Sequence, residues 1–576
     1  MARLDVQQAA YRILVVSAVA VVVGTVASLA AIAFVEALHF LNDRLLISPY
    51  ARIQMDHRPL WLMAATVLVP TLGGLLVGII VRWGVDERRG LTPADAILAV
   101  QTRRPPPRLR SGLVSSLAAL LSLGSGASVG QYGPLAFLGA HLGGLAGRLR
   151  LRLKNLQAIA IACGVAAAIS TAFNAPIAGL VFAHEVILRH YSLRAFAPVT
   201  VAAAIGYVVD NVLFDRPPLF RVNFLGVEHS YEFVLFAVEG VLCAGLAVAF
   251  ILLLQSSGRL AQCLPLPDWG RPAAAGLVLG LVALWLPEVL GIGQETLRFA
   301  TIESAFAVHE LALIVVAKLA LTALCIGFGF VGGVFSPALL IGILFGALYG
   351  VILPLVLPVP LSGQVVYAVC GMMAMASAVI GAPLTTILIV FELTRSYDLT
   401  IAAMVAVVFS NLVSYRVMGR SIFDIQLRER GFDLSLGRDK AILGTHPVRD
   451  FISERFTTAT EGEEVAAVRD RLVKDRRSEA MLLDARGLYL GTLHLQDLDS
   501  VPVDQAIRTL ASSPEVLFHE DTTVWQSMEL LQGFLGEAVP MVATDGRLLG
   551  VVPEEAVIRA YLEIIHDLRQ EENEAA

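Results

Sequence analysis

The sequence predicts a mostly α-helical, polytopic membrane protein built from two related halves and followed by a smaller α/β tail. Its 576 residues are 56% hydrophobic and 16% charged, with a mean hydropathy of +0.71. Soluble domains carry about 25% charged residues, so the composition is typical of a membrane protein. Two further observations support the prediction: charged residues become frequent only beyond residue 430, and one glycine-rich motif occurs twice.

The rise in charge density divides the chain into a membrane domain at 1–430, a linker at 431–446 and a cytoplasmic tail at 447–576. The net charge of -6 and the lack of a basic stripe argue against nucleic acid as a partner. The five cysteines include no CxxC pair and favour neither a disulfide framework nor a metal site. The first apolar run is too long for a signal-peptide core, so we expect a retained first span.

Strongly apolar segments, several of them near 20 residues, are long enough to cross about 30 Å of hydrocarbon as helices. They lie at 13–40, 60–82, 196–214, 231–255, 271–290, 311–326, 338–358 and 399–418. Shorter apolar segments are interrupted by Gly and Pro at 111–123, 134–146, 157–171, 176–188, 365–380 and 383–394. Broken helices are tolerated in a membrane only where protein or a watery cavity surrounds the break, so these segments predict a polar path inside the protein.

Basic residues suggest the orientation of the chain. Clusters at 103–110 and 148–154 follow early spans, and further arginines follow the last span at Arg416, Arg420, Arg428 and Arg430. By the positive-inside rule these positions face the cytoplasm, and the tail lies there too.

The repeat is the strongest structural signal. GSGASVGQYGP (124–134) and GFGFVGGVFSP (327–337) share glycines at the first, third and seventh positions and proline at the eleventh, 203 residues apart. FNAPIAGLVFAHE (173–185) and IGAPLTTILIVFE (380–392) share Ala-Pro and a glutamate nine residues later, with their prolines 207 residues apart. Two motifs recurring in the same order indicate a duplicated membrane unit, with a site near the midplane where the interrupted helices meet.

Helices that begin inside the membrane direct a partial positive charge and unpaired N–H groups at whatever lies ahead of them. Glycines before the start allow close approach of a ligand, and Pro134 and Pro337 suit a first helical turn. Two such helix starts facing each other predict a site for a small anion, which can leave again because no full cationic side chain holds it.

These motifs resemble those of the CLC chloride channels and proton/chloride exchangers. GQYGP (130–134) is similar to their GKEGP motif, GGVFSP (332–337) to GxFxP, and SIFDIQL (421–427) to the start of their last membrane helix. The resemblance implies the CLC fold with two inverted-topology repeats, a homodimer with one chloride pathway per subunit, and a multi-pass location in the bacterial inner (plasma) membrane. It implies an anion pathway formed by Gly90, Gly130, Gln131, Tyr132, Gly133, Gly333, Val334, Phe335 and Phe423.

The sequence departs from the family at its functional positions. Tyr132 replaces the gating glutamate, and Val186 occupies the position of the internal proton glutamate. RGLTP (89–93) aligns with the GSGIP loop, which places Gly90 at the chloride-binding serine, and Phe423 aligns with the tyrosine that caps the same site.

These replacements predict passive conduction without proton exchange. A tyrosine titrates near pH 10, so Tyr132 is ionised at only about one part in a thousand at pH 7 and acts as a neutral gate. Val186 carries no proton. The hydroxyl donors lost at Gly90 and Phe423 are each worth about 0.5–1.5 kcal/mol, so backbone N–H groups must supply more of the anion binding.

The tail looks like a tandem pair of CBS domains, because 481–493 and 541–552 each read as strand, Gly-containing turn and strand. In nucleotide-binding copies the second strand is followed by Ser or Thr and then Asp. Here these positions hold His494 and Asp497 in the first copy, and Pro553 and Ala556 in the second. We therefore favour a dimer-stabilising or regulatory module over an adenine-nucleotide sensor, and expect no other cofactor.

Two alternatives stay open beside the passive channel: a proton/chloride exchanger with a non-standard proton route, and a non-conducting anion sensor. Glu185 and Glu392 match each other by symmetry and serve either proton transfer or the anchoring of helix ends. Structural roles are favoured for Lys318 and Glu239 within their apolar runs. No nucleophile–base pair, metal-ligand set or P-loop appears, so we expect no enzymatic activity.

Overall fold

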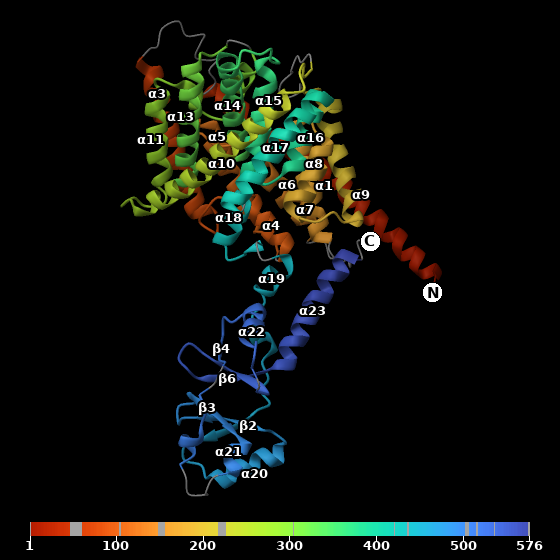
Figure 1. Ribbon diagram of the computed structural model, residues 1–576, viewed down its shortest axis with the longest axis vertical. Helices are drawn as coiled ribbons and strands as arrows, with labels where there is room; N and C mark the ends of the chain where they lie inside the picture. The colour runs from red at the N-terminus through yellow and green to blue at the C-terminus, as the bar shows by residue number, and fades with distance from the viewer. Residues whose placement is uncertain are drawn as a thin grey trace. The chain divides into compact units, whose positions relative to one another are not determined.

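The computed structural model describes residues 2–45, 60–102, 105–147, 156–216, 226–302, 305–419, 421–434, 437–500, 506–513, 516–534 and 536–573. They form two compact units, Met1–Arg430 and Gly431–Ala576 (Figure 1). The basic cluster at 148–154, the first two arginines of the cluster at 103–110, and Arg420 lie outside the described residues.

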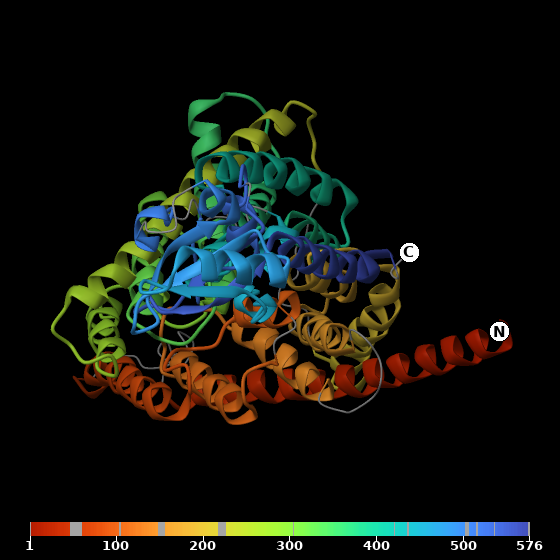
Figure 2. The same ribbon diagram turned by 90° about the horizontal axis from the view of Figure 1, so that it is seen from below.

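The first unit is a bundle of helices, most of them apolar along their whole length. In the first half of this unit they are α1 (Ala2–Arg44), α3 (Leu60–Gly84), α4 (Pro93–Gln101), α5 (Leu109–Gly124), α6 (Tyr132–Ala146), α7 (Leu156–Phe173), α8 (Pro176–Phe182) with the π-helix η1 (Ala183–Leu188), and α9 (Leu193–Tyr207) with the π-helix η2 (Val208–Leu213). Helix α1 packs against α7 and α9, and its N-terminal turns extend past them (Figure 2).

The second half of this unit begins with a second long helix. Its helices are α10 (Glu232–Cys263), α11 (Arg271–Ala283), η3 (Pro287–Val289), α12 (Gln294–Ala300), α13 (Val308–Gly327), α14 (Phe335–Val356), α15 (Gln364–Ile380), α16 (Pro383–Thr394), α17 (Tyr397–Met418) and α18 (Ile422–Glu429). Within the described residues, eight helices are long and apolar enough to cross a membrane.

Every predicted apolar segment contains a helix, and two segments differ in extent from the prediction. The segment 271–290 is not one span, because α11 ends at Ala283 and Pro287 begins a separate short 3-10 helix. The segment 157–171, placed among the shorter ones, belongs to a continuous helix of 18 residues, α7.

The duplicated glycine motif has the same backbone conformation in both halves. Gly126 and Gly329, the third glycine positions of the two motifs, adopt left-handed φ angles of 86° and 99°. Each then donates its N–H to the carbonyl three residues earlier, Gly126 to Leu123 at 3.1 Å and Gly329 to Ile326 at 3.0 Å. The helices α5 and α13 therefore end in the same turn.

The second repeated motif is also matched in structure. Asn174 and Gly381, which precede the Ala-Pro pairs, both have positive φ angles, 54° and 71°. Arg189 and Arg395, which close the following helices, have φ angles of 57° and 52°. Left-handed backbone at corresponding places of both halves is the structural counterpart of the sequence repeat.

Each half caps a helix of the other half with its repeated glutamate. Glu392 accepts hydrogen bonds at 2.9 and 2.7 Å from the N–H groups of the second and third residues of α8. Glu185 accepts bonds at 3.0 and 2.9 Å from the corresponding N–H groups of α16, and a third at 2.7 Å from the Thr385 hydroxyl. Helices α8 and α16 lie side by side (Figure 1). Both carboxylates therefore anchor helix ends, which is one of the two roles that the sequence left open for Glu185 and Glu392.

Lys318 has the structural role that the sequence favoured. Its side chain is fully buried in α13, and its Nζ donates to the carbonyls of Val289 at 2.9 Å and Gly291 at 2.7 Å. Gly291 in turn donates its N–H to the Gly126 carbonyl at 2.8 Å. The buried amine therefore holds the loop that supports the first glycine motif.

The second unit contains two small sheets, as the tail sequence predicts. The first has β1 (Thr457–Thr460) parallel to β2 (Glu479–Leu483), which is antiparallel to β3 (Tyr489–His494). The second repeats this order with β4 (Phe518–His519), β5 (Ala538–Val542) and β6 (Leu548–Pro553). The turns contain Gly487 and Gly546, both with positive φ.

Helices cover these sheets and complete two hydrophobic cores. They are α19 (Arg438–Leu443), η5 (Val448–Phe451), α20 (Val465–Asp475), α21 (Leu495–Asp499), η6 (Ile507–Leu510), α22 (Val524–Leu530) and α23 (Glu554–Asn573).

Candidate functional site

The two glycine motifs meet through their backbones. The N–H of Gly130 donates to the Gly333 carbonyl at 2.7 Å, and the N–H of Gly333 donates to the Gly130 carbonyl at 2.7 Å. A Cβ atom on Gly333 would lie 2.8 Å from the Gly133 nitrogen, so only glycine allows this approach. Helices α6 and α14 begin directly beyond the contact, at Tyr132 and Phe335.

A side-chain hydrogen bond also joins the two glycine motifs. Ser336 Oγ accepts a hydrogen bond at 3.1 Å from the Gln131 N–H. The first N–H groups of α6 and α14 have no acceptor within their own helices and carry the positive ends of the two helix dipoles. The meeting point therefore offers fixed donors to a negatively charged ligand.

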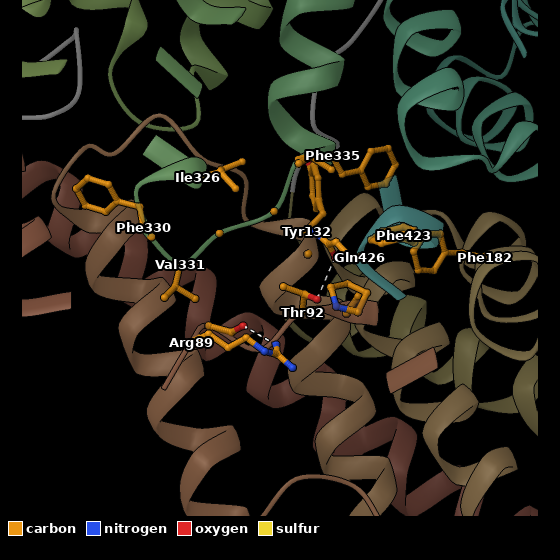
Figure 3. Close-up of a pocket in the computed structure, with 18 residues that line it drawn as sticks. Arg89, Thr92, Tyr132, Phe182, Ile326, Phe330, Val331, Phe335, Phe423 and Gln426 are labelled. Carbon is orange, nitrogen blue, oxygen red and sulfur yellow. Dashed lines mark hydrogen bonds between the residues drawn. The ribbon is translucent and has the colours of Figure 1, made fainter. Parts of the chain in front are cut away.

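A cavity of about 200 Å³ lies beside this meeting point (Figure 3). The predicted pathway residues that line it are Gly90, Tyr132, Gly133, Gly333, Val334, Phe335 and Phe423. Gly130 and Gln131 do not line it, because they are buried in the contact between the two motifs. Among the described residues that line the cavity there is no Asp or Glu.

Tyr132 closes one side of the cavity as part of an aromatic cluster. Its side chain is 3% exposed, and its ring stacks on Phe173 with centroids 3.9 Å apart. The Phe335 ring meets the Tyr132 ring edge-on at 5.6 Å and lies 5.4 Å from Phe173. Phe182, which also lines the cavity, stacks on Phe335 at 6.4 Å.

Val186 and Gly90 have different surroundings. Val186 is buried in η1 and does not line the cavity. Gly90 does line it, and a Cβ atom there would lie 2.9 Å from Val331 Cγ1. The Val331 side chain occupies the space that a serine at position 90 would need, which gives a physical reason for glycine at this place.

The sequence also matches known families. The family described as voltage gated chloride channel matches residues 73–415, which is more than half of the chain. The chain belongs to this family. The CBS domain family matches residues 507–563, within the second unit. The predicted CLC membership and the predicted CBS tail are confirmed.

Relatives of the CLC family align over most of the membrane unit. A chloride channel protein described as ClcB-like from Ralstonia nicotianae is 32% identical over 70% of this chain and 95% of its own length. The voltage-gated ClC-type chloride channel ClcB of Shigella flexneri is 30% identical over 62% of this chain and 85% of its own length.

Solved structures show the same fold. A slow cyanobacterial Cl-/H+ antiporter has a TM-score of 0.64 at 22% identity, over 72% of this chain and 97% of the antiporter. A eukaryotic CLC transporter has a TM-score of 0.63 at 20% identity, over 94% of this chain and 98% of the transporter. The chain is thus a multi-pass membrane protein of the CLC fold with a C-terminal CBS region.

Three polar residues of the CLC cavity were missed by the sequence reasoning: Arg89, Thr92 and Gln426. In the RGLTP segment, Arg89 directly precedes Gly90 and Thr92 follows it by two residues. Gln426 lies one helical turn after Phe423 on α18. The sequence signal that could have identified these three residues is that they lie close in sequence to Gly90 or Phe423.

The tail contains a second cavity, of about 480 Å³. It is lined by His494 and Asp497, but not by Pro553 or Ala556. Two further carboxylates, Glu479 and Glu537, lie on its wall. Burial raises the pKa of the Glu479 carboxyl above its ordinary value, although His494, with Nδ1 at 3.5 Å, opposes the shift.

Proposed function

We propose that the protein conducts chloride passively, without coupling to protons, through the cavity at the two helix starts. Tyr132 is the gate of this pathway. The observation that carries the proposal is the buried Tyr132 ring, stacked on Phe173 where the family has its gating glutamate. A neutral phenol neither competes with chloride as an anion nor releases a proton at pH 7.

The proposed anion is chloride because the aligned relatives are described as chloride channels. Helix-start N–H groups at Gly133, Val334 and Phe335 supply donors without a permanent counter-charge, which suits an ion that must leave as well as enter. We further propose a homodimer in a bacterial plasma membrane, with the tail on the cytoplasmic side.

The test is the reversal potential of the purified protein in liposomes, with a proton gradient at constant chloride and with a chloride gradient at constant pH. Passive conduction predicts a potential that follows chloride alone. A potential that shifts with the proton gradient would establish coupled exchange. Absence of chloride efflux from liposomes containing folded protein would establish the anion sensor instead.

A proton/chloride exchanger is the second candidate, and two buried acidic residues favour it. Glu232 is fully buried and accepts hydrogen bonds from the Tyr367 hydroxyl at 2.6 Å and the Ser362 hydroxyl at 2.8 Å. Glu239, two turns later on α10, is fully buried against the backbone of Gly346 and Gly371. Intramembrane carboxyl groups are frequent parts of proton routes. Glu239→Gln would abolish a pH-dependent shift of the reversal potential if this route operates.

For the tail, we propose a regulatory or dimer-stabilising role without an adenine nucleotide. The lining carboxylates Glu479, Asp497 and Glu537 repel a polyphosphate, which supports this proposal. ATP at millimolar concentration should therefore leave the thermal unfolding of the full-length protein unchanged. An increase in the melting temperature that depends on ATP concentration, and that Asp497→Ala removes, would contradict it.

A further inference from the structure

The cavity beside the two helix starts has few polar side chains. Among the described residues that line it, Arg89, Thr92, Tyr132 and Gln426 carry side-chain hydrogen-bond donors. Arg89 already makes a two-bond pair with Asp95, at 2.7 and 3.1 Å, and also donates to the Gly90 carbonyl at 3.2 Å. The donors of Arg89 are therefore largely engaged within the protein.

The hydrogen bonds around Thr92 have a fixed direction. Arg430 Nη2 donates to Thr92 Oγ1 at 2.9 Å, and a guanidinium has no acceptor atom. The hydroxyl hydrogen of Thr92 is then free to donate onward, and it does so to Gln426 Oε1 at 3.2 Å. The dashed line between Thr92 and Gln426 in Figure 3 marks this bond.

This chain of bonds orients the Gln426 amide. The Oε1 atom of Gln426 accepts the hydrogen bond from Thr92. The other end of the amide is therefore the Nε2 group, which has two N–H donors. No hydrogen bond to a described residue uses this nitrogen. Gln426 lines the cavity and lies beside Tyr132 in Figure 3.

Charged side chains lie behind the amide. Arg89 and Arg430 share the carboxylate of Asp95, with the Arg430 contact at 3.3 Å. Glu87 attracts Arg89 and Glu429 attracts Arg430 at longer range, so the two guanidinium groups are compensated by nearby carboxylates. Arg430 therefore acts on the amide through its hydrogen bond to Thr92, and the amide itself supplies the donor.

We propose that the Gln426 amide donates a hydrogen bond to the permeating anion and sets its affinity in the cavity, with Thr92 and Arg430 as positioning residues. The inference rests on the proposed anion pathway and names its side-chain donor. Gln426 stands one turn beyond Phe423, and the amide thus replaces the hydroxyl donors that are missing at Gly90 and Phe423. A neutral donor binds an anion more weakly than a guanidinium does, so the anion can leave.

The experiment measures the rate of chloride flux in proteoliposomes as a function of chloride concentration. Loss of one hydrogen bond predicts that Gln426→Leu raises the half-saturating chloride concentration about 3- to 10-fold. Thr92→Val should also raise the half-saturating chloride concentration, but by a smaller factor. Thr92→Ser, which keeps the hydroxyl, should have the wild-type value. The matched control is Gln262→Leu, at an exposed position on α10 that does not line the cavity.

A purely structural role of Gln426 has a different signature. It would lower the maximal flux per folded protein and leave the half-saturating concentration unchanged, and that result would overturn the proposal. Gln426→Glu gives a second measurement, because its carboxylate repels the anion at neutral pH and loses its charge near pH 4.3. We expect flux through this variant to recover as the pH falls, and a flat response would count against the proposal.

A different measurement tests passive conduction itself, so a failure of the proposed function can be told apart from a failure of the Gln426 proposal. A wild-type reversal potential that follows the proton gradient would remove the proposed function. The concentration shift in Gln426→Leu would still decide whether this amide contacts the anion.

Discussion

Tyr132, the residue that we propose as the gate, is aromatic and neutral at physiological pH, whereas the family motif that GQYGP resembles has a glutamate at this position. Its ring is buried and its centroid lies 3.9 Å from that of Phe173, so an ion on the proposed pathway must displace the ring or pass its edge. In this proposal the stacking energy of such a pair, about 0.5–1.5 kcal/mol, is part of the barrier to conduction.

Tyr132→Ala should therefore raise chloride flux about 2- to 10-fold, since the stacking on Phe173 no longer has to be broken. Efflux from liposomes at equal protein content measures this. Phe299→Ala, at a half-exposed position on α12, is the control and should leave flux unchanged. Loss of flux in a folded Tyr132→Ala protein would show that the hydroxyl is an essential ligand of the anion.

Tyr132→Glu should introduce a pH dependence that the wild type lacks. The carboxylate is charged above its ordinary pKa, near 4.3, and then blocks the anion, so flux should rise as the pH falls through this range. Flux measured between pH 4 and pH 8 tests the prediction. A response as flat as that of the wild type would place residue 132 away from the permeating ion.

Gly333 shows how narrow the steric limits at the meeting point are. In Gly333→Ala the new methyl group would lie 2.8 Å from the Gly133 nitrogen, so the two helix starts must separate. We expect flux to fall at least about tenfold, and stability to fall by about 1–3 kcal/mol. Gly245→Ala is the matched control, because no atom lies within 4 Å of a Cβ there. Equal behaviour of the two variants in flux and thermal unfolding would contradict the prediction.

At the scale of elements, the reciprocal caps of α8 and α16 replace backbone partners that these helix starts lack. Glu392→Gln removes the charge from the α8 cap and should cost about 0.5–2 kcal/mol of stability, with flux and reversal potential unchanged. Thermal unfolding of the purified protein measures the loss, and Glu454→Gln, at an exposed position of the second unit, is the control. A changed reversal potential in Glu392→Gln would instead give this carboxylate a transport role.

The elements were largely predictable because hydropathy and motif repetition are local properties of the chain. The interrupted helices, the duplicated motifs and the strand pairs of the tail all leave such signals. For helix α7 the sequence predicts a shorter segment, 157–171, because its small residues make a continuous span of 18 residues look interrupted. The role proposed for Gln426 could not be predicted from the sequence, because it depends on a hydrogen bond to Thr92, which is 334 residues away, and no local pattern encodes that contact.

At the scale of the whole molecule, the chain is two units with separate interiors. The membrane unit buries its helices against one another, while the tail has hydrophobic cores of its own, including the fully buried Met541. Units with independent cores unfold in separate transitions unless a large interface couples them.

Met541→Ala should therefore lower the stability of the tail by about 2–5 kcal/mol and leave chloride flux unchanged at temperatures where the tail stays folded. Calorimetry of the full-length protein should show one transition moving and the other fixed. Leu549→Ala, at an exposed position of β6, is the control. Movement of both transitions together would show that the two units unfold as one.

Glu185 and Glu392, which each cap a helix of the other half, also have a consequence for biosynthesis. Glu185 leaves the ribosome about 200 residues before the N–H groups that it binds on α16, and until then its carboxylate and the start of α8 both lack their final partners. The last helices of the first half therefore gain these hydrogen bonds only after the second half has been translated. A truncated chain ending before α16 should therefore be recognised by membrane quality control as incomplete, however hydrophobic its spans are.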